Sequence, residues 1–327
     1  MKRVFDLQQI LRPVDEPLQR VTDRLMVCLQ NPVARMVAYL IVAGGKRLRP
    51  ALVLLAGKSG PRRDRQRSLV DLATAVELIH TATLIHDDII DRSTLRRKQP
   101  TFHQRFGTER AVLMGDYLYA NAFAILAGIR QAYVTRHLAE ICQQMSRGEF
   151  SEVESRYNLS LTEAEYLQIV KDKTASLIAA SCHLGAYLGG AKPQTIGRIT
   201  DFGWNLGMAF QIMDDCLDLI GEEKLLGKSL RSDLDKGLLS LPIIYLAGSL
   251  SRQERDTLLA PLRRQAQDRA FLAKIARQAR KSGAISRALS RAEQFVQAAT
   301  GAVAIQDGVA LPETYRQLAR YAIARTQ

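Results

Sequence analysis

Residues 79–91 read IHTATLIHDDIID, an apolar segment that runs directly into three aspartates. If the segment is helical, Asp87 and Asp91 lie four residues apart and project from the same side. Like charges at this spacing destabilise a helix, so a protein keeps them most readily where a cation lies between them. Mg²⁺ fits this position because it prefers oxygen ligands and is held by one or two carboxylates together with substrate phosphates.

The same acidic pattern occurs a second time, in the stretch FQIMDDCLD at residues 210–218. Asp214, Asp215 and Asp218 again follow an apolar run, residues 202–213. Two facing carboxylate clusters suit one ligand, and a diphosphate bridged by magnesium ions fits between them. We therefore predict a metal and diphosphate site rather than two unrelated acidic helix ends. Cys216 is expected to be a packing residue, since no other Cys or His lies at metal-ligand spacing.

Basic residues occur where a diphosphate would need them. Residues 44–50, GGKRLRP, combine flexible glycines with three cations, and arginine matches phosphate oxygens bidentately. The spacing of a P-loop is missing. His80 lies two helical turns before Asp87 and so on roughly the same face. The other basic candidates are Arg96, Arg97, Lys173 and Lys228.

The remaining pattern is that of a nearly all-helical protein. Proline is absent between Pro100 and Pro193 and between Pro193 and Pro242, and apolar residues there recur at intervals of three and four. Alternating β-branched runs are absent. We expect helix boundaries at residues 44–45, 97–100, 158–162 and 189–190. No gap is long enough for an interdomain linker, so residues 1–327 are predicted to form a single domain.

Composition sets further limits. The chain has 327 residues, of which 47% are hydrophobic, and a net charge of +13, which favours anionic partners. Four scattered cysteines suggest neither a disulfide framework nor a zinc site. We find no apolar run long enough to span a membrane and no export signal, and so expect a cytoplasmic protein. Residues 251–327 hold 14 basic and 6 acidic residues, which indicates solvated helix faces or a peripheral membrane contact for product release.

Taken in order, GGKRLRP, IHTATLIHDDIID followed by Arg96-Arg97, GDYL, Lys173-Thr174-Ala175 and FQIMDDCLD closely resemble the motifs of the trans-isoprenyl diphosphate synthases, the polyprenyl synthetase family. The resemblance runs from about Gly44 to Leu246. It implies an all-α, single-domain helical bundle of the isoprenoid-synthase type around a deep central cavity, with a homodimer as the usual assembly. It also implies an enzyme that condenses isopentenyl diphosphate with an allylic diphosphate primer to give an all-trans polyprenyl diphosphate.

The resemblance carries roles over to individual residues. The expected magnesium ligands are Asp87, Asp91, Asp214 and Asp218, with Asp88 and Asp215 binding directly, through water or behind them. The residues that match positions around the allylic diphosphate are Arg96, Lys173, Thr174, Gln211 and Lys228. Those that match the isopentenyl diphosphate site are Lys46, Arg49, His80 and Arg97.

Product length is expected to depend on Ala82 and Thr83, about one turn before Asp87. Within the family, bulky aromatic residues at these positions stop the growing chain early. Since both residues are small here, we predict a product longer than farnesyl, with the floor of the cavity at Phe123 or Tyr133. One departure from the family pattern concerns the basic residues: Leu238 stands where a phosphate-binding lysine often lies, and Lys236 comes two residues earlier.

Other interpretations stay open. The chain could be a short-chain synthase that makes geranylgeranyl or farnesyl diphosphate, or a subunit of a heteromeric synthase. A terpene cyclase shares the metal-triggered ionisation but has no need for the second diphosphate site that GGKRLRP and His80 indicate. Charge alone would allow nucleic-acid binding, but the acidic clusters and the sparse aromatic residues of the basic segment argue against it.

Overall fold

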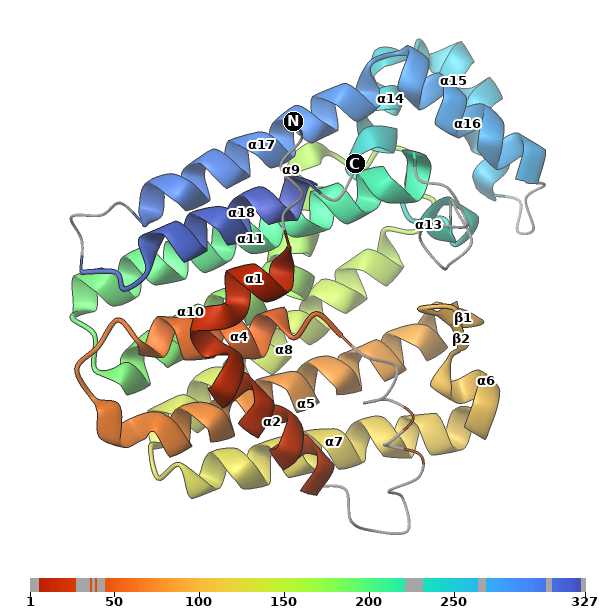
Figure 1. Cartoon of the computed structure of the whole chain (residues 1–327). Coiled ribbons are helices and arrows are strands. Elements are labelled where there is room, and N and C mark those ends of the chain that lie inside the picture. The colour runs from red at the N-terminus through yellow and green to blue at the C-terminus, as the bar shows by residue number, and fades with distance from the viewer. Residues whose placement is uncertain are drawn as a thin grey trace.

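The chain folds into a bundle of long helices that run roughly along one direction (Figure 1). The computed structural model describes residues 6–27, 36, 39, 45–220, 232–263, 269–303 and 308–324. The helices are α1 Leu7–Leu11, α2 Asp15–Val27, α4 Leu48–Gly57, α5 Gln66–Ile90, α6 Phe102–Phe106, α7 Thr108–Gly128, α8 Ala132–Glu154, α9 Glu163–Val170, α10 Ser176–Gly189, α11 Pro193–Ile220, α13 Ser232–Asp235, α14 Leu241–Ser249, α15 Arg252–Leu258, α16 Arg269–Lys281, α17 Ala284–Ala302 and α18 Pro312–Ala324. Short 3-10 turns lie at Arg12–Val14, Arg63–Arg65 and Ala260–Arg263. The prediction of an all-α fold is confirmed.

Helix α5 lies inside the bundle and packs against α2, α4, α7 and α10. Because neighbours cover it on several sides, most of its apolar residues are buried, including Leu72, Val76 and Ile79. It ends where the Asp91 N–H donates to the Asp87 carbonyl, 2.8 Å away. Helix α11 ends at the same end of the bundle, on the right of Figure 1, so the two acidic motifs are brought together.

The expected helix boundaries are found in the described residues. Helix α9 begins with a capping box, in which the Thr162 side chain accepts from the Glu165 N–H and Glu165 accepts from the Thr162 N–H. Helix α10 ends at Gly189, the next residue Gly190 has a φ of +76°, and α11 starts at Pro193. Of the boundary at residues 44–45, Gly44 lies outside the described residues.

Between α5 and α6 the chain forms a small hairpin that the sequence did not indicate. Strands β1 Leu95–Arg96 and β2 Gln99–Pro100 pair antiparallel. The two loop residues, Arg97 and Lys98, have φ values of 52° and 66°. A two-residue loop with both φ values positive fits the right-handed twist of a hairpin and favours glycine or asparagine. The hairpin therefore holds two basic residues in a conformation that costs them free energy.

Helices α9 and α10 are joined without a break by a π-helical segment, Lys171–Ala175. Such a segment adds one residue to a turn and is frequent at functional sites. It carries Lys173 and Thr174, two of the predicted substrate-binding residues. Helix α8 approaches it closely: a Cβ atom on Gly148 would lie 2.5 Å from the Lys173 backbone nitrogen. Glycine at position 148 thus permits the contact that brings Lys173 toward α8.

Two helices are long and apolar enough to cross a membrane by length and composition, which the sequence analysis did not expect. They are α5 and α7. In the most apolar 18-residue stretch of each helix, 67% of α5 and 33% of α7 is buried in the fold. A helix in the middle of a bundle is apolar on all sides, so α5 passes this test for reasons of packing. Helix α7 exposes a surface that includes Val112 and Leu113.

Helices α4 and α10 also pack at short range. A Cβ atom on Gly185 would lie 2.3 Å from the Val53 carbonyl oxygen, which is backbone and cannot turn aside. Gly197 on α11 has no atom within 4 Å of its Cβ position. The two glycines thus differ in the space around them, although both lie inside helices.

Replacing each glycine by alanine tests this packing. Gly185→Ala is expected to destabilise the protein by about 1 to 3 kcal/mol, because an added group in a closely packed core forces the backbone to shift. Gly197→Ala should instead raise stability by up to about 1 kcal/mol through helix propensity. Urea denaturation of both variants measures the difference. Equal effects of the two changes would contradict the close approach of α4 and α10.

Candidate functional site

A polar cavity of about 190 Å³ lies where the ends of α5 and α11 meet α8 and the π-helical segment. Asp91 and Asp214, one from each acidic motif, both line it. Three further predicted residues also line it: Lys173, Thr174 and Gln211. With Asp215, the fold gathers six of the predicted site residues around one space.

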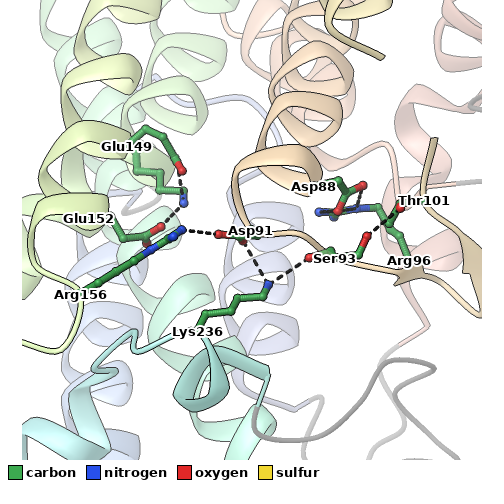
Figure 2. A network of polar contacts seen from close by, with 10 residues as sticks. Asp88, Asp91, Ser93, Arg96, Thr101, Glu149, Glu152, Arg156 and Lys236 are labelled. Atoms are coloured by element: carbon green, nitrogen blue, oxygen red, sulfur yellow. Dashed lines mark hydrogen bonds and ion pairs between the residues drawn. The ribbon is translucent and has the colours of Figure 1, made fainter. Parts of the chain in front are cut away.

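The three aspartates of the first motif have different partners. Arg96 donates to both oxygens of Asp88, from Nε at 3.0 and 2.9 Å and from Nη2 at 2.8 Å, and only 4% of Asp88 is exposed. Asp91 accepts from Arg156 Nη2 at 2.9 Å and from Lys236 Nζ at 3.2 Å. Figure 2 shows Asp91 between these two cations. Each carboxylate is thus stabilised by a cation from another element.

Asp87, the first aspartate of the motif, lies beside Lys173 and Glu149 on the wall of a neighbouring cavity. Burial raises the pKa of Asp87 to about 7, while the charge of Lys173 opposes this rise and that of Glu149 adds to it. Lys173 forms ion pairs with Glu149, at 2.6 Å, and with Glu152. Burial also raises the pKa of Glu152. This corner of the site holds more negative than positive charge and favours a further cation.

In the second motif Asp214 and Asp215 both line the polar cavity, and Asp214 is the partly exposed one of the two. Tyr166 Oη donates to Asp215 Oδ2 at 2.6 Å and Gln211 Nε2 donates to Oδ1 at 2.8 Å. Burial, followed by the charge of Asp233, raises the pKa of Asp215 well above its usual value. Asp218 is only 2% exposed and does not line the cavity. Asp214 is therefore the carboxylate of this motif best placed to reach a ligand.

A second, smaller cavity of about 60 Å³ lies on the other side of α5 and is rich in arginine. His80, Arg96 and Arg97 line it. Arg96 also pairs with Asp88, and its charge acts on Asp87, so its expected place at the allylic diphosphate stays a prediction. Arg47 also lines the cavity and pairs with Glu77, although it was not among the residues expected at the isopentenyl diphosphate site.

Arg49 and Lys46, the other two residues predicted for this second site, do not line the cavity, and they differ in their contacts. Arg49 Nη1 is 3.1 Å from His80 Nε2. Burial lowers the pKa of His80 well below its usual value, and the charge of Arg49 adds to this, so neutral His80 accepts a hydrogen bond from Arg49. Lys46 is exposed, and its ammonium lies 5.1 Å from the centre of the Tyr321 ring rather than in the cavity.

The third cavity, about 390 Å³, is mostly apolar and lies between α5, α7 and α8. Thr83 lines it, one turn before Asp87, together with Tyr119 and Met145. Ala82 is completely buried in the core and is not among the residues that line it, so its role in product length stays a prediction. Helix geometry accounts for the difference. Thr83 lies four residues before Asp87, so the two side chains are about 40° apart around the helix axis, whereas Ala82 lies five residues before Asp87 and is about 140° away.

The expected floor of this cavity also changes. Tyr133 Oη lies 2.7 Å from His183 Nε2 on α10, its ring packs against Tyr187, and Tyr133 does not line the cavity. Phe123 does not line the cavity, but Tyr119 does, one helical turn nearer to Asp87. The sequence signal for Tyr119 was its place directly after GDYL.

The acidic motifs fit a divalent metal only in part. No group of three or more His, Cys, Asp or Glu side chains close enough to hold an ion by itself occurs in the described residues. One or two carboxylates from each motif would leave the other coordination positions to water and a diphosphate, which is how Mg²⁺ is usually held. Asp87, Asp91 and Asp214 are the fitting donors. Lys228 lies outside the described residues.

Comparison with known proteins gives a consistent result. The family model for polyprenyl synthetase matches residues 30–279. The heptaprenyl diphosphate synthase component 2 of Geobacillus stearothermophilus is 35% identical over 96% of this chain and 95% of its own. The geranylgeranyl diphosphate synthase of Methanosarcina mazei is 40% identical over 68% of this chain and 70% of its own. The crystal structure of a polyprenyl synthase from Caulobacter crescentus, complexed with calcium and isoprenyl diphosphate, matches with a TM-score of 0.92 and 31% identity over the whole of both chains.

The raised pKa of Asp87 predicts how stability depends on pH in the absence of divalent metal. The unfolded chain loses the Asp87 proton near pH 4 and the folded protein near pH 7, so the folded state binds more protons between these values. Stability therefore falls as pH rises through this window. Asp87→Asn has no such proton and should gain stability relative to the wild type, by about 4 kcal/mol, between pH 4 and pH 8.

Urea denaturation at both pH values in the presence of EDTA measures this difference. Asp201→Asn removes an exposed aspartate of α11 and serves as the control for a lost carboxylate. A stability difference between wild type and Asp87→Asn that does not change with pH would contradict the burial of an ionisable Asp87.

Proposed function

The chain belongs to the polyprenyl synthetase family and is a chain-elongating trans-prenyltransferase; on this premise we propose that it joins isopentenyl diphosphate to an allylic diphosphate and makes an all-trans product longer than farnesyl. One observation carries this proposal. Lys173 lines both the polar cavity and the apolar cavity, so a diphosphate at the acidic motifs would continue directly into a space for a hydrocarbon chain.

The family uses a divalent metal, and we propose Mg²⁺ held by Asp87, Asp91 and Asp214, with Asp218 behind them. When bound, the ion supplies positive charge to the diphosphate as the allylic carbon to oxygen bond breaks. Lys173 lines the same cavity as Asp91 and Asp214. Such preplaced charge stabilises the departing diphosphate more than the intact substrate, and only that difference accelerates the reaction.

The arginine-rich cavity is the proposed site for isopentenyl diphosphate. Arg49 and Arg97 offer guanidinium groups that match phosphate oxygens, and neutral His80 orients Arg49. Positive charge prevails in this cavity, so the diphosphate can bind there without a metal. The Asp88 ion pair fixes Arg96 between the two sites. The new carbon to carbon bond forms between the two substrates, a proton is then lost, and no side chain has to act as a nucleophile.

The proposed product length rests on the apolar cavity. Thr83 leaves space beside Asp87, and the cavity extends along α8 from Glu149 to Met145. The relatives named above range from geranylgeranyl to heptaprenyl synthases, so they fix the reaction but not the length. The local geometry around Thr83 and Tyr119 is therefore the argument for a product beyond farnesyl.

We also propose that the protein forms a homodimer through α7 and α8. Large apolar side chains are exposed on these helices, among them Leu113 at 67% and Phe150 at 71%. Exposed apolar patches of this kind commonly mark interaction sites. A heteromeric assembly is the second candidate, because the Geobacillus relative is named as component 2 of a synthase. Elongation by the purified chain alone would decide for the homodimer.

Removal of a proposed metal ligand should lower turnover far more than it lowers stability. Asp87→Ala, Asp91→Ala and Asp214→Ala are each expected to lose at least about two orders of magnitude in turnover, equal to about 2.7 kcal/mol of barrier. The measurement is incorporation of labelled isopentenyl diphosphate with an allylic primer and Mg²⁺. Asp201→Ala is the matched control. If one of the three variants keeps near-normal turnover, the residue replaced in it is not a metal ligand.

Product length should respond to the size of residue 83. Thr83→Phe is expected to shorten the product while leaving the first condensation intact, because it fills the apolar cavity without touching either diphosphate site. Chromatography of the dephosphorylated products measures chain length. Ala120→Phe places the same ring on the exposed face of α7 and should leave the length unchanged. A wild-type product no longer than farnesyl, or an unchanged length in Thr83→Phe, would overturn the proposed length.

A further inference from the structure

Lys236 contacts the first acidic motif although it lies 145 residues further along the chain. Its ammonium is 3.2 Å from Asp91 Oδ2 and 3.0 Å from Ser93 Oγ, and Figure 2 shows it reaching upward to both groups. Arg156 holds the other oxygen of Asp91 at 2.9 Å. Both oxygens of Asp91 are thus engaged by cations of the protein itself.

The backbone around Lys236 is held in place by neighbouring elements. The Tyr157 N–H donates to the Gly237 carbonyl at 2.8 Å, and the Leu238 N–H donates to the Asp233 carbonyl at 2.8 Å. Gly237 has a φ of +75°, and a Cβ atom there would lie 2.4 Å from the Tyr157 ring. Lys236 is therefore presented to the site by a fixed turn, and its position beside Asp91 is not that of a freely moving surface lysine.

The same turn places Leu238 on the wall of the polar cavity. Leucine cannot contact a phosphate oxygen, so within the described part of this turn Lys236 is the cation nearest to the cavity. Lys236 is only 20% exposed in its side chain, which limits screening of its charge by water. A lysine also has a flexible four-carbon stem and one compact charge, so it can change partner within a few ångströms more easily than a bidentate arginine can.

Electrostatics then restricts what can bind. A divalent ion at Asp91 would lie close to the ammonium of Lys236, and like charges at such a distance repel. If a diphosphate arrives together with the ion, its oxygens provide a new partner for the ammonium. Metal and diphosphate therefore bind more favourably together than separately, and by thermodynamic linkage each raises the affinity of the other by the same factor.

Resting on the proposed function of the acidic motifs, we propose that Lys236 is a substrate-positioning residue that pairs with Asp91 and transfers to the diphosphate when a metal takes Asp91. It thereby couples metal binding to diphosphate binding. A purely structural ion pair would instead stay on Asp91 throughout and would contribute equally to every state.

The test measures binding by calorimetry, using Mg²⁺ alone and inorganic pyrophosphate in saturating Mg²⁺. Lys236→Gln is expected to bind Mg²⁺ alone more tightly than the wild type, because a competing cation is gone. It should bind pyrophosphate in saturating Mg²⁺ about tenfold more weakly, in line with the loss of one charge-assisted contact. Lys281→Gln, an exposed lysine on α16, makes the same change in net charge and should alter neither affinity.

A restoring variant sharpens the result. In the Lys236→Gln background, Leu238→Lys places an ammonium on the cavity wall and should recover pyrophosphate affinity while leaving Mg²⁺ binding tight. Circular dichroism checks that each variant folds, and Lys236→Met replaces Lys236→Gln if the latter does not fold. Unchanged pyrophosphate affinity, or weaker binding of Mg²⁺ alone, overturns the proposal. Elongation and pyrophosphate binding by the wild type test the proposed function separately. The proposed function and the proposed role of Lys236 can therefore fail independently.

Discussion

The ion pairs of Asp91 join three parts of the chain that are far apart in sequence. Asp91 caps α5, Arg156 follows α8, and Lys236 lies in the turn before α14. Removing one partner from a buried ion pair leaves an uncompensated charge and is strongly destabilising. The carboxylates that the site needs therefore also determine how the helix ends are arranged, because each must find a cation from another element.

The π-helical segment explains how the site reaches into two cavities at once. Its extra residue turns Lys173 toward α8, where Gly148 leaves room for the backbone. From there the ammonium contacts Glu149 and Glu152 and borders both the polar and the apolar cavity. A regular helix would place the side chains after this segment about 100° away from their observed direction. Local irregularity in the helix is thus directly linked to the position of a functional charge.

The sequence predicted the helices and the acidic motifs because both depend on local spacing. Periodicity fixes a helix, and the position of Asp87 relative to Thr83 follows from residues per turn, which could also have excluded Ala82 from the cavity. Partners across the fold could not be predicted: nothing near Asp91 in the sequence points to Arg156. The hairpin was missed because its loop residues, Arg97 and Lys98, are not typical of positive φ.

The two diphosphate sites differ in the sign of the charge that surrounds them. Around the polar cavity and Asp87, carboxylates from α5, α8 and α11 outnumber the described cations, so a diphosphate can bind there only with additional positive charge. In the second cavity Arg47 pairs with Glu77, while Arg97 has no such pairing among the ion pairs described for this cavity. We therefore propose that a metal-bound diphosphate binds at the first site and a metal-free one at the second. On this proposal only the first diphosphate meets a charge able to help its departure, so the two substrates take different roles although both carry a diphosphate.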